Sequence, residues 1–243
     1  MRIPTLCGLI DRRVLVNFRV DPEVLSRVCP SPFRPQVVNG YGIAGICLIR
    51  LKQIRPKGLP SFVGITSENA AHRIAVQWDA DGVAQTGVYI PRRDTSSFMT
   101  AFAGGRIFPG VHHRARFDVD ETEQEYRIAM ASVDGTVHAA VDGQTTDELP
   151  DASVFDTVAT CSLFFEAGSL GYSPANSPAE FDGLQLRTSN WHVQPLSVRN
   201  VQSSFFENRD AFPEGSITFD NALLMRGIEH QWRSRRSLCG DCI

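Results

Sequence analysis

Alternating apolar residues are the feature that most restricts how this chain can fold. Residues 14–20 carry Val or Phe at every even position, and a period of two is typical of a β-strand with one buried face. Segments of similar character flank turn signals such as Asn39-Gly40, Asp81-Gly82 and Asp134-Gly135, which favour hairpins. We therefore expect many antiparallel strands joined by tight turns.

Short helices are expected between the strands. Asp21-Pro22-Glu23 places a capping residue before a proline at the first helical position, and apolar spacing predicts further helices over 95–103 and roughly 153–166. Residues 217–225 fit either a strand or a helix. No dinucleotide-binding glycine motif and no phosphate-binding P-loop occurs. The pattern predicts an α+β, mostly β fold whose curved antiparallel sheet closes into a barrel or cone.

Length and charge restrict the organisation and the partners. The 243 residues are expected to form a single domain, residues 1–243, with a barrel core over about 12–232 and a tail over 233–243. The net charge of −3 predicts no nucleic-acid or membrane partner, and no segment approaches the 18 apolar residues of a membrane span. Irregularly spaced cysteines predict reduced thiols in the cytoplasm.

No cofactor and no metal is expected. Cys239 and Cys242 form a C-x-x-C pair, but zinc needs four ligands and no second pair stands at a standard spacing. Serine-hydrolase and zinc-protease motifs are absent as well.

The basic residues are nearly all arginines. Of the 24 basic residues only Lys52 and Lys57 are lysines. Arginine stays charged and holds a carboxylate in a fixed fork, whereas a buried lysine can lose its proton and act as a nucleophile. Amine chemistry therefore has two candidate side chains, although codon bias would also explain the count.

Residues 103–114 are the main candidate for a functional site. Gly104-Gly105 allows close approach of the backbone, Arg106 could clamp a carboxylate, and His112 and His113 could transfer protons near neutral pH. On a strand the two histidines would point to opposite faces, so only one of them could face a pocket. A glycine corner with surface histidines and arginine is the structural alternative.

Three other positions are weaker candidates. Glu68, just before a strand, could act as a base or orient one, Trp191-His192 could form an aromatic wall of a pocket, and Arg92-Arg93 could bind an anion. Each has a simpler explanation: a solvated glutamate, a core tryptophan beside an exposed histidine, and charges that face water.

Four segments together resemble a known family. They are residues 17–25 (Asn-Phe-Arg-Val-Asp-Pro-Glu-Val-Leu), residues 55–60 (Arg-Pro-Lys-Gly-Leu-Pro), Glu68, and residues 191–196 (Trp-His-Val-Gln-Pro-Leu). Their order and spacing resemble the uncharacterised family called domain of unknown function 2071, which belongs to the acetoacetate decarboxylase-like superfamily. The resemblance covers about residues 14–232. It implies a cone-shaped antiparallel β barrel with a few short helices and a central cavity, often in an oligomer, so a homo-oligomer is expected.

In the decarboxylases of that superfamily a glycine–arginine turn leads into a Phe-Pro-Lys-Lys-like motif, and a glutamate comes from an earlier strand. One of the two lysines forms a Schiff base with the substrate. The resemblance implies that Gly105-Arg106 and Phe108-Pro109 match the turn and that Glu68 matches the glutamate.

The catalytic lysines of the decarboxylases have no match in this chain. Aligned at Phe108-Pro109, the lysine positions hold Gly110 and Val111, and with two residues inserted they hold His112 and His113. Lys52 and Lys57 lie far away along the chain, so an imine with a keto acid has no evident nucleophile.

Three functions are therefore open. The first is an enzyme acting on a small organic acid, with Arg106 on the carboxylate, Trp191 at the substrate, and Glu68 with His112 or His113 moving protons. The second is a non-catalytic module that binds a small carboxylate or an apolar metabolite. The third is a structural or interaction protein with a filled barrel. Fold alone cannot choose among them, but the composition of the pocket can.

Overall fold

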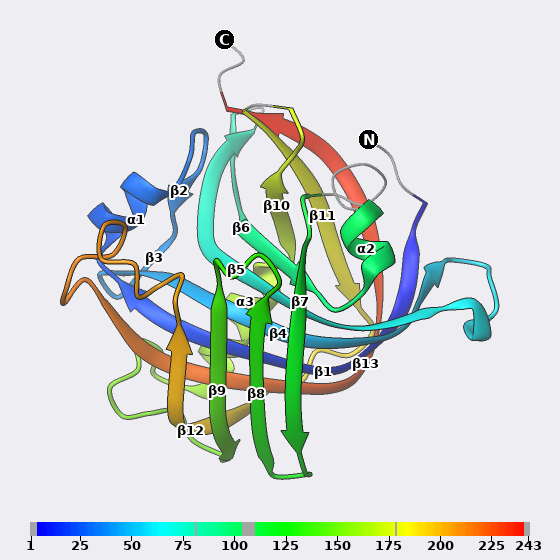
Figure 1. The fold of residues 1–243 in the computed structure, drawn as a ribbon. Coiled ribbons are helices and arrows are strands. Elements are labelled where there is room, and N and C mark those ends of the chain that lie inside the picture. Colours follow the sequence, from blue (N-terminus) through cyan, green and yellow to red (C-terminus); the bar gives the residue numbers. More distant parts are fainter. Residues whose placement is uncertain (1–3, 81, 104–109, 178, 241–243) are drawn as a thin grey trace.

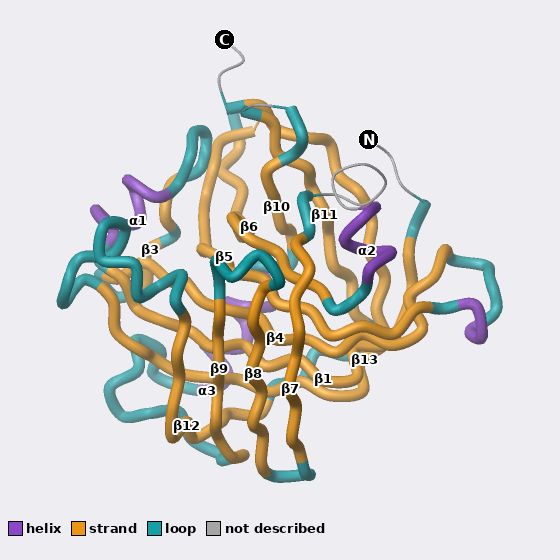
Figure 2. The backbone as a smooth tube through the Cα atoms, in the orientation of Figure 1, coloured by secondary structure: helices purple, strands orange, loops and turns teal. Residues whose placement is uncertain are grey.

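The computed structural model describes residues 4–80, 82–103, 110–177 and 179–240. Within these residues the chain is mostly β (Figures 1 and 2), and its strands join into one sheet. The strands are β1 (Leu6–Val20), β2 (Arg34–Pro35), β3 (Val37–Val38), β4 (Tyr41–Pro56), β5 (Ile65–Ala80), β6 (Val83–Thr95), β7 (His113–Glu121), β8 (Glu125–Ser132), β9 (His138–Thr145), β10 (Leu170–Pro174), β11 (Glu180–Thr188), β12 (Gln194–Ser203) and β13 (Ile217–Cys239).

Helices are short, and two of them begin at side-chain caps; those expected over 95–103 and 153–166 begin later, at Phe98 and Val158. In α1 (Pro22–Val28) the Asp21 carboxylate accepts a hydrogen bond from the backbone N–H of Glu23, and proline stands at the first helical position. In α3 (Val158–Ala167) Thr157 and Thr160 form a reciprocal capping box. The remaining helical elements are α2 (Phe98–Ala103) and the 3₁₀ turn η1 (Ser61–Val63).

The sheet closes on itself. The strands β6, β5, β4, β1, β13, β11 and β10 are paired each to the next, and β10 pairs back to β6. A second circuit leaves β6 through β7, β8, β9 and β12 and returns at β13, and these strands cross in front of the long curved strands in Figure 1. Described pairs are antiparallel except for β6–β10 and β6–β7, which are parallel. The expected mostly β barrel is confirmed, with these two parallel contacts as the departure.

Strand alternation places two apolar cores on the two faces of the shared wall β1–β4–β5. Val14 and Val16 of β1 belong to one core, whereas Leu15 belongs to the other. Helix α3 packs on this second face through Cys161 and Phe165. The second face therefore lies inside the ring that β10 and β11 complete, and this ring contains the candidate site.

Several local expectations are corrected. Residues 217–225 are part of a strand, β13, which continues through Cys239 and pairs along β11, so residues 233–239 belong to the sheet. The loop between β11, which ends at Thr188, and β12, which begins at Gln194, contains Trp191 and His192. Within the described residues, no helix has the length and apolar character needed to cross a membrane.

The cysteines differ in their oxidation state. Cys7, Cys29, Cys47 and Cys161 are free, as expected. Cys239 is disulfide-bonded, so the expectation of reduced thiols does not hold for that residue. Cys242 lies outside the described residues.

Candidate functional site

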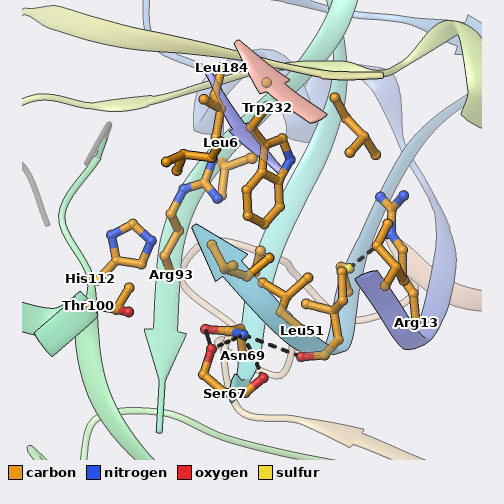
Figure 3. A pocket seen from close by; sticks show the side chains of 18 of the residues that line it. Leu6, Arg13, Leu51, Ser67, Asn69, Arg93, Thr100, His112, Leu184 and Trp232 are labelled. Atoms are coloured by element: carbon orange, nitrogen blue, oxygen red, sulfur yellow. Dashed lines mark hydrogen bonds between the residues drawn. The ribbon is translucent and has the colours of Figure 1, made fainter. Parts of the chain in front are cut away.

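A cavity of about 430 Å³ lies inside the ring of strands (Figure 3). Each strand of the ring contributes at least one residue to its wall, as does α3. The volume falls in the range of small-molecule sites, about 300–1,000 Å³. Most of the wall is apolar, and the apolar residues include Leu6, Ile10, Leu51, Ile90, Leu184 and Trp232.

The period of two along β5 decides which polar side chains reach this cavity. Ser67, Asn69 and Arg73 line it, whereas Glu68 and His72, at the intervening positions, project to the opposite face of the sheet. The Asn69 side-chain amide donates to the backbone oxygen of Ser67 at 3.1 Å and to its hydroxyl at 3.0 Å. These two residues form a small polar floor in a mostly apolar wall (Figure 3).

Arg93 and His112 lie side by side at one side of the cavity (Figure 3). The Nε of Arg93 donates to the hydroxyl of Ser173 at 2.8 Å, and its guanidinium has no acidic partner among the described residues. Burial lowers the pKa of Arg93 to about 10. Asp94 is the acidic residue of the cavity wall, but its carboxylate is held by Arg92, whose Nη2 is 2.8 Å away. The Arg93 charge is therefore not compensated by the described residues.

His112 is a neutral hydrogen-bonding group. Its Nδ1 is 2.9 Å from the carbonyl oxygen of Gly110, which can only accept, so Nδ1 carries the proton and Nε2 has the free lone pair. Burial, together with the charge of Arg93, lowers the pKa of His112 to about 3.

Arg13 and Arg73 lie elsewhere in the cavity wall. Arg13 donates from Nε to the sulfur of Cys47 at 3.3 Å and from Nη1 to the sulfur of Met225 at 3.9 Å. Arg73 is 4% exposed and donates to the side-chain oxygen of Asn17. Burial and the charge of Arg13 lower the pKa of Arg73 to about 10. Neither guanidinium has a carboxylate partner among the described residues.

A fourth arginine of the wall, Arg55, differs from these three. It donates to the backbone carbonyl oxygens of Leu59 at 2.9 Å and Gln53 at 2.7 Å. Its N–H groups thus have strong acceptors already, so Arg13, Arg73 and Arg93 are the cations of interest.

Glu68 is not one of the residues that line the cavity. Its two carboxylate oxygens are each 2.5 Å from an arginine, Arg12 and Arg50. Both arginines also pair with Glu121, at 2.7 and 2.6 Å, so the four residues form a closed ion-pair ring. Arg12 is fully buried, which makes this ring structural, and we do not place Glu68 in the candidate site.

The other sequence candidates divide between the cavity and its surroundings. The two histidines point different ways: His112 lines the cavity, while Nδ1 of His113 is 3.4 Å from Asp134 outside it. Trp191 lines the cavity and donates from its indole N–H to the Ser162 hydroxyl at 3.0 Å. Arg106 lies outside the described residues.

Sequence reasoning missed Arg13, Arg73 and the inward direction of Arg93. A signal existed for the first two, because each stands in phase with apolar residues that turned out to face inward: Arg13 with Leu15, and Arg73 with Ala71 and Ala75. For Arg93 no comparable signal exists. It is out of phase with Val88 and Ile90, which also line the cavity, because an irregularity between Tyr89 and Arg92 changes the parity of β6.

Neither lysine lines the cavity. Lys52 is 2.9 Å from Asp11 with its side chain 43% exposed, and Lys57 follows the end of β4. Among the described residues no group of three or more His, Cys, Asp or Glu side chains is arranged to hold a metal ion.

Comparison with known proteins supports the same fold. The model of a family described as an uncharacterised conserved protein, domain of unknown function 2071, matches residues 10–218. No curated protein matches the chain.

Solved structures with the same fold include three relevant proteins. Acetoacetate decarboxylase from Legionella pneumophila is 10% identical, with 97% of this chain and 88% of that chain covered and a TM-score of 0.61. An acetoacetate decarboxylase-like enzyme from Sphingomonas wittichii RW1 is 11% identical, with 98% of this chain and 93% of that chain covered and a TM-score of 0.59. The enduracididine biosynthesis enzyme MppR complexed with pyruvate is 11% identical, with 98% of this chain and 91% of that chain covered and a TM-score of 0.56. At these identities the likeness is one of fold.

Proposed function

Because this chain belongs to the uncharacterised family of domain of unknown function 2071, we propose its function from its own cavity: it binds a small organic acid. Arg93 holds the acid group, and the apolar wall encloses the body of the molecule. The single observation that carries this proposal is the Arg93 guanidinium, which lies in a mostly apolar cavity with no acidic partner among the described residues.

The physical reason is the cost of an uncompensated charge on a residue that is only partly exposed. A guanidinium removed from water is stabilised when a carboxylate pairs with it, and the fork of N–H groups fits two carboxylate oxygens at once. Ser173 already fixes the Nε of Arg93, so the rest of the guanidinium is oriented before a ligand arrives. A structure of the same fold, MppR, was determined with pyruvate, which is itself a carboxylate.

A non-catalytic binding role fits the resting state of the site best. A histidine whose pKa is about 3 is a weak base, and the nearest alternative base from the sequence, Glu68, is committed to Arg12 and Arg50. No primary amine from the two lysines reaches the wall. The cavity is therefore better equipped to recognise an acid than to transform it.

One observation favours a catalytic alternative. The Nε2 of His112 carries the free lone pair, and part of the depression of the His112 pKa comes from Arg93. A bound carboxylate would neutralise that charge and raise the pKa of His112 toward the range useful for proton transfer. Proton exchange at the carbon next to the carboxylate, followed in deuterated water, distinguishes this alternative from simple binding.

The test of the proposal is binding of acids and their neutral amides. Hexanoate, benzoate and pyruvate are compared with the matching amides by calorimetry and by thermal unfolding. A ligand at 100 times its dissociation constant adds about 2.7 kcal/mol to the free energy of unfolding. We expect at least one acid, and none of the amides, to produce such a shift.

Arg93→Met should abolish the shift while the free protein stays as stable as wild type, because an uncompensated, partly buried charge is removed. The matched control is Arg127→Met, since Arg127 is a surface arginine paired with Asp142 at 3.3 Å. The proposal fails if no acid binds, or if Arg93→Met binds the acids as tightly as Arg127→Met does.

A further inference from the structure

The cavity has a second cationic side that one acid group at Arg93 leaves unused. Figure 3 shows Arg93 and His112 at one side and Arg13 at the opposite side, with Trp232 and Leu51 between them. All five residues line the same cavity. A ligand that fills the cavity therefore meets a guanidinium at each end.

Arg13 lacks a strong acceptor among the described residues. The partners of its N–H groups are two sulfur atoms, of Cys47 and Met225, and sulfur is a weak hydrogen-bond acceptor. The guanidinium lies 5.9 Å from the centre of the Trp191 ring. This aromatic contact orients the cation without neutralising it.

Arg73 adds an unpartnered polar atom to the wall, and His230 lies near Arg13 without lining the cavity. The Nε of Arg73 is buried and has no hydrogen-bond partner among the described residues. Each of the two side chains belongs to a residue that is 4% exposed. The His230 ring contacts the ring of Trp232, whose centre is 4.6 Å away, and Trp232 lines the cavity.

The space between the two sides is mostly apolar, with Ser67 and Asn69 as its polar floor. Leu51 and Trp232 lie along it (Figure 3). The faces of these side chains suit a run of methylene groups.

We propose that the natural ligand carries two anionic ends joined by an apolar spacer, as in an α,ω-dicarboxylate. One end pairs with Arg93 and the other with Arg13, with Arg73 beside it. A monoacid would satisfy only one side and leave the opposite guanidiniums uncompensated in an apolar wall. This inference rests on the proposed function for the Arg93 end and adds the second end.

The test compares diacids with their own monomethyl esters, which keep the length and shape but lose one charge. Glutarate, adipate, suberate and azelate are titrated into the wild-type protein by calorimetry. We expect one chain length to bind about tenfold or more tightly than its monoester, because a second charge-assisted, two-point contact forms only in the diacid. Arg13→Met should bring the ratio of the two affinities close to one, and Arg127→Met should retain the wild-type ratio.

The outcomes separate the two proposals. If monoesters bind but no diacid binds more tightly than its monoester, the two-ended ligand is wrong and the organic-acid site stands. If neither series binds to the wild-type protein, both proposals fail. The wild-type comparison decides the inference by itself, so it does not depend on whether Arg13→Met folds.

Discussion

Three desolvated histidines should make this protein unstable in mild acid: His72 and His230 are buried, and His112 is partly exposed in the cavity wall. Burial lowers the pKa of His72 and of His112 from 6.5 to about 3, and that of His230 to about 4, and in each case a neighbouring arginine contributes. In the unfolded chain these side chains titrate near 6.5. Below that pH the unfolded chain binds protons that the native protein does not bind, so the free energy of unfolding falls as the pH falls.

The size of the effect follows from the number of protons. One proton bound only by the unfolded chain changes the free energy of unfolding by about 1.4 kcal/mol per pH unit. At pH 5 this amounts to roughly 2 kcal/mol for each histidine and about 6 kcal/mol for the three. A typical domain is stable by only about 5–15 kcal/mol, so this loss would leave the protein near its unfolding threshold.

Carboxylates contribute little in this window. Asp11 and Glu121 have pKa values lowered below their ordinary 3.8 and 4.5 by arginine and lysine partners that outweigh burial. Their stabilising effect is therefore present above these values and is lost only in stronger acid. Asp94 acts in the opposite direction, because burial raises its pKa, and its protonation offsets part of the histidine effect as the pH falls.

The assay is urea unfolding followed by tryptophan fluorescence at pH 7.5, 6.5, 5.5 and 5.0. His230→Phe keeps an aromatic ring but removes one titrating group, and it should reduce the slope against pH by about one third. His138→Gln is the control, because His138 is exposed. A free energy of unfolding that stays constant between pH 7.5 and 5.0 would refute the reasoning, as would a His230→Phe slope equal to that of wild type.

Two further predictions concern the stability of the sheet that surrounds the cavity. Glu68→Gln should lower the free energy of unfolding by about 2 kcal/mol, since the fully buried Arg12 loses one of its two charged partners. The variant should bind organic acids with unchanged affinity in calorimetry. A loss of affinity without a loss of stability would show that Glu68 belongs to the site. Gly45→Ala should cost about 3 kcal/mol or more in urea unfolding, because a Cβ there would collide with the backbone oxygen of Val16. Gly168→Ala, whose Cβ would meet its nearest atom at 3.6 Å, is the matched control and should change stability little.

The fold could be predicted further than the site, because strand alternation is a local signal. The even-numbered apolar residues of 14–20 indicated one buried face, and that face is a core of the structure. His112 and His113 do diverge, but His112 precedes β7, which begins at His113, so strand alternation is not the reason. It could not tell which face holds a cavity, because this depends on β10 and β11 closing a ring across sequence separations of about 80 residues.

Pairing between distant strands also explains the placement of Glu68. Its position before a strand suggested a carboxylate at a pocket mouth, yet its face is set by the parity of β5. The other three members of its ion-pair ring, Arg12, Arg50 and Glu121, come from three other strands. None of these four residues is close to another in the sequence, so no local pattern joins them. The cavity arginines differ in this respect, because an arginine in phase with buried apolar residues can be recognised once the inward face is known.

The cavity has cationic arginines but no lysine amine. The consequence of this for covalent chemistry can be tested by introducing a lysine. Wild-type protein treated with acetoacetate and borohydride should show no reduced covalent adduct in its intact mass, because neither Lys52 nor Lys57 lines the cavity. Arg93→Lys would place a primary amine in the desolvated environment that already lowers the pKa of Arg93. Burial lowers the pKa of a lysine in the same way and leaves part of it as the free, nucleophilic amine.

We therefore expect Arg93→Lys to be trapped as an adduct, with Arg127→Lys on the exposed surface as the untrapped control. An adduct on the wild-type protein would overturn the view that this barrel lacks an imine-forming group. The absence of an adduct on Arg93→Lys would have a different meaning. Either a small acid does not reach position 93, or the surroundings of that position do not lower the pKa of a lysine. Arginine and lysine carry the same charge, but only lysine can give up its proton and form a bond with a carbonyl carbon. The identity of this one cation would thus separate recognition of an acid from covalent chemistry on it.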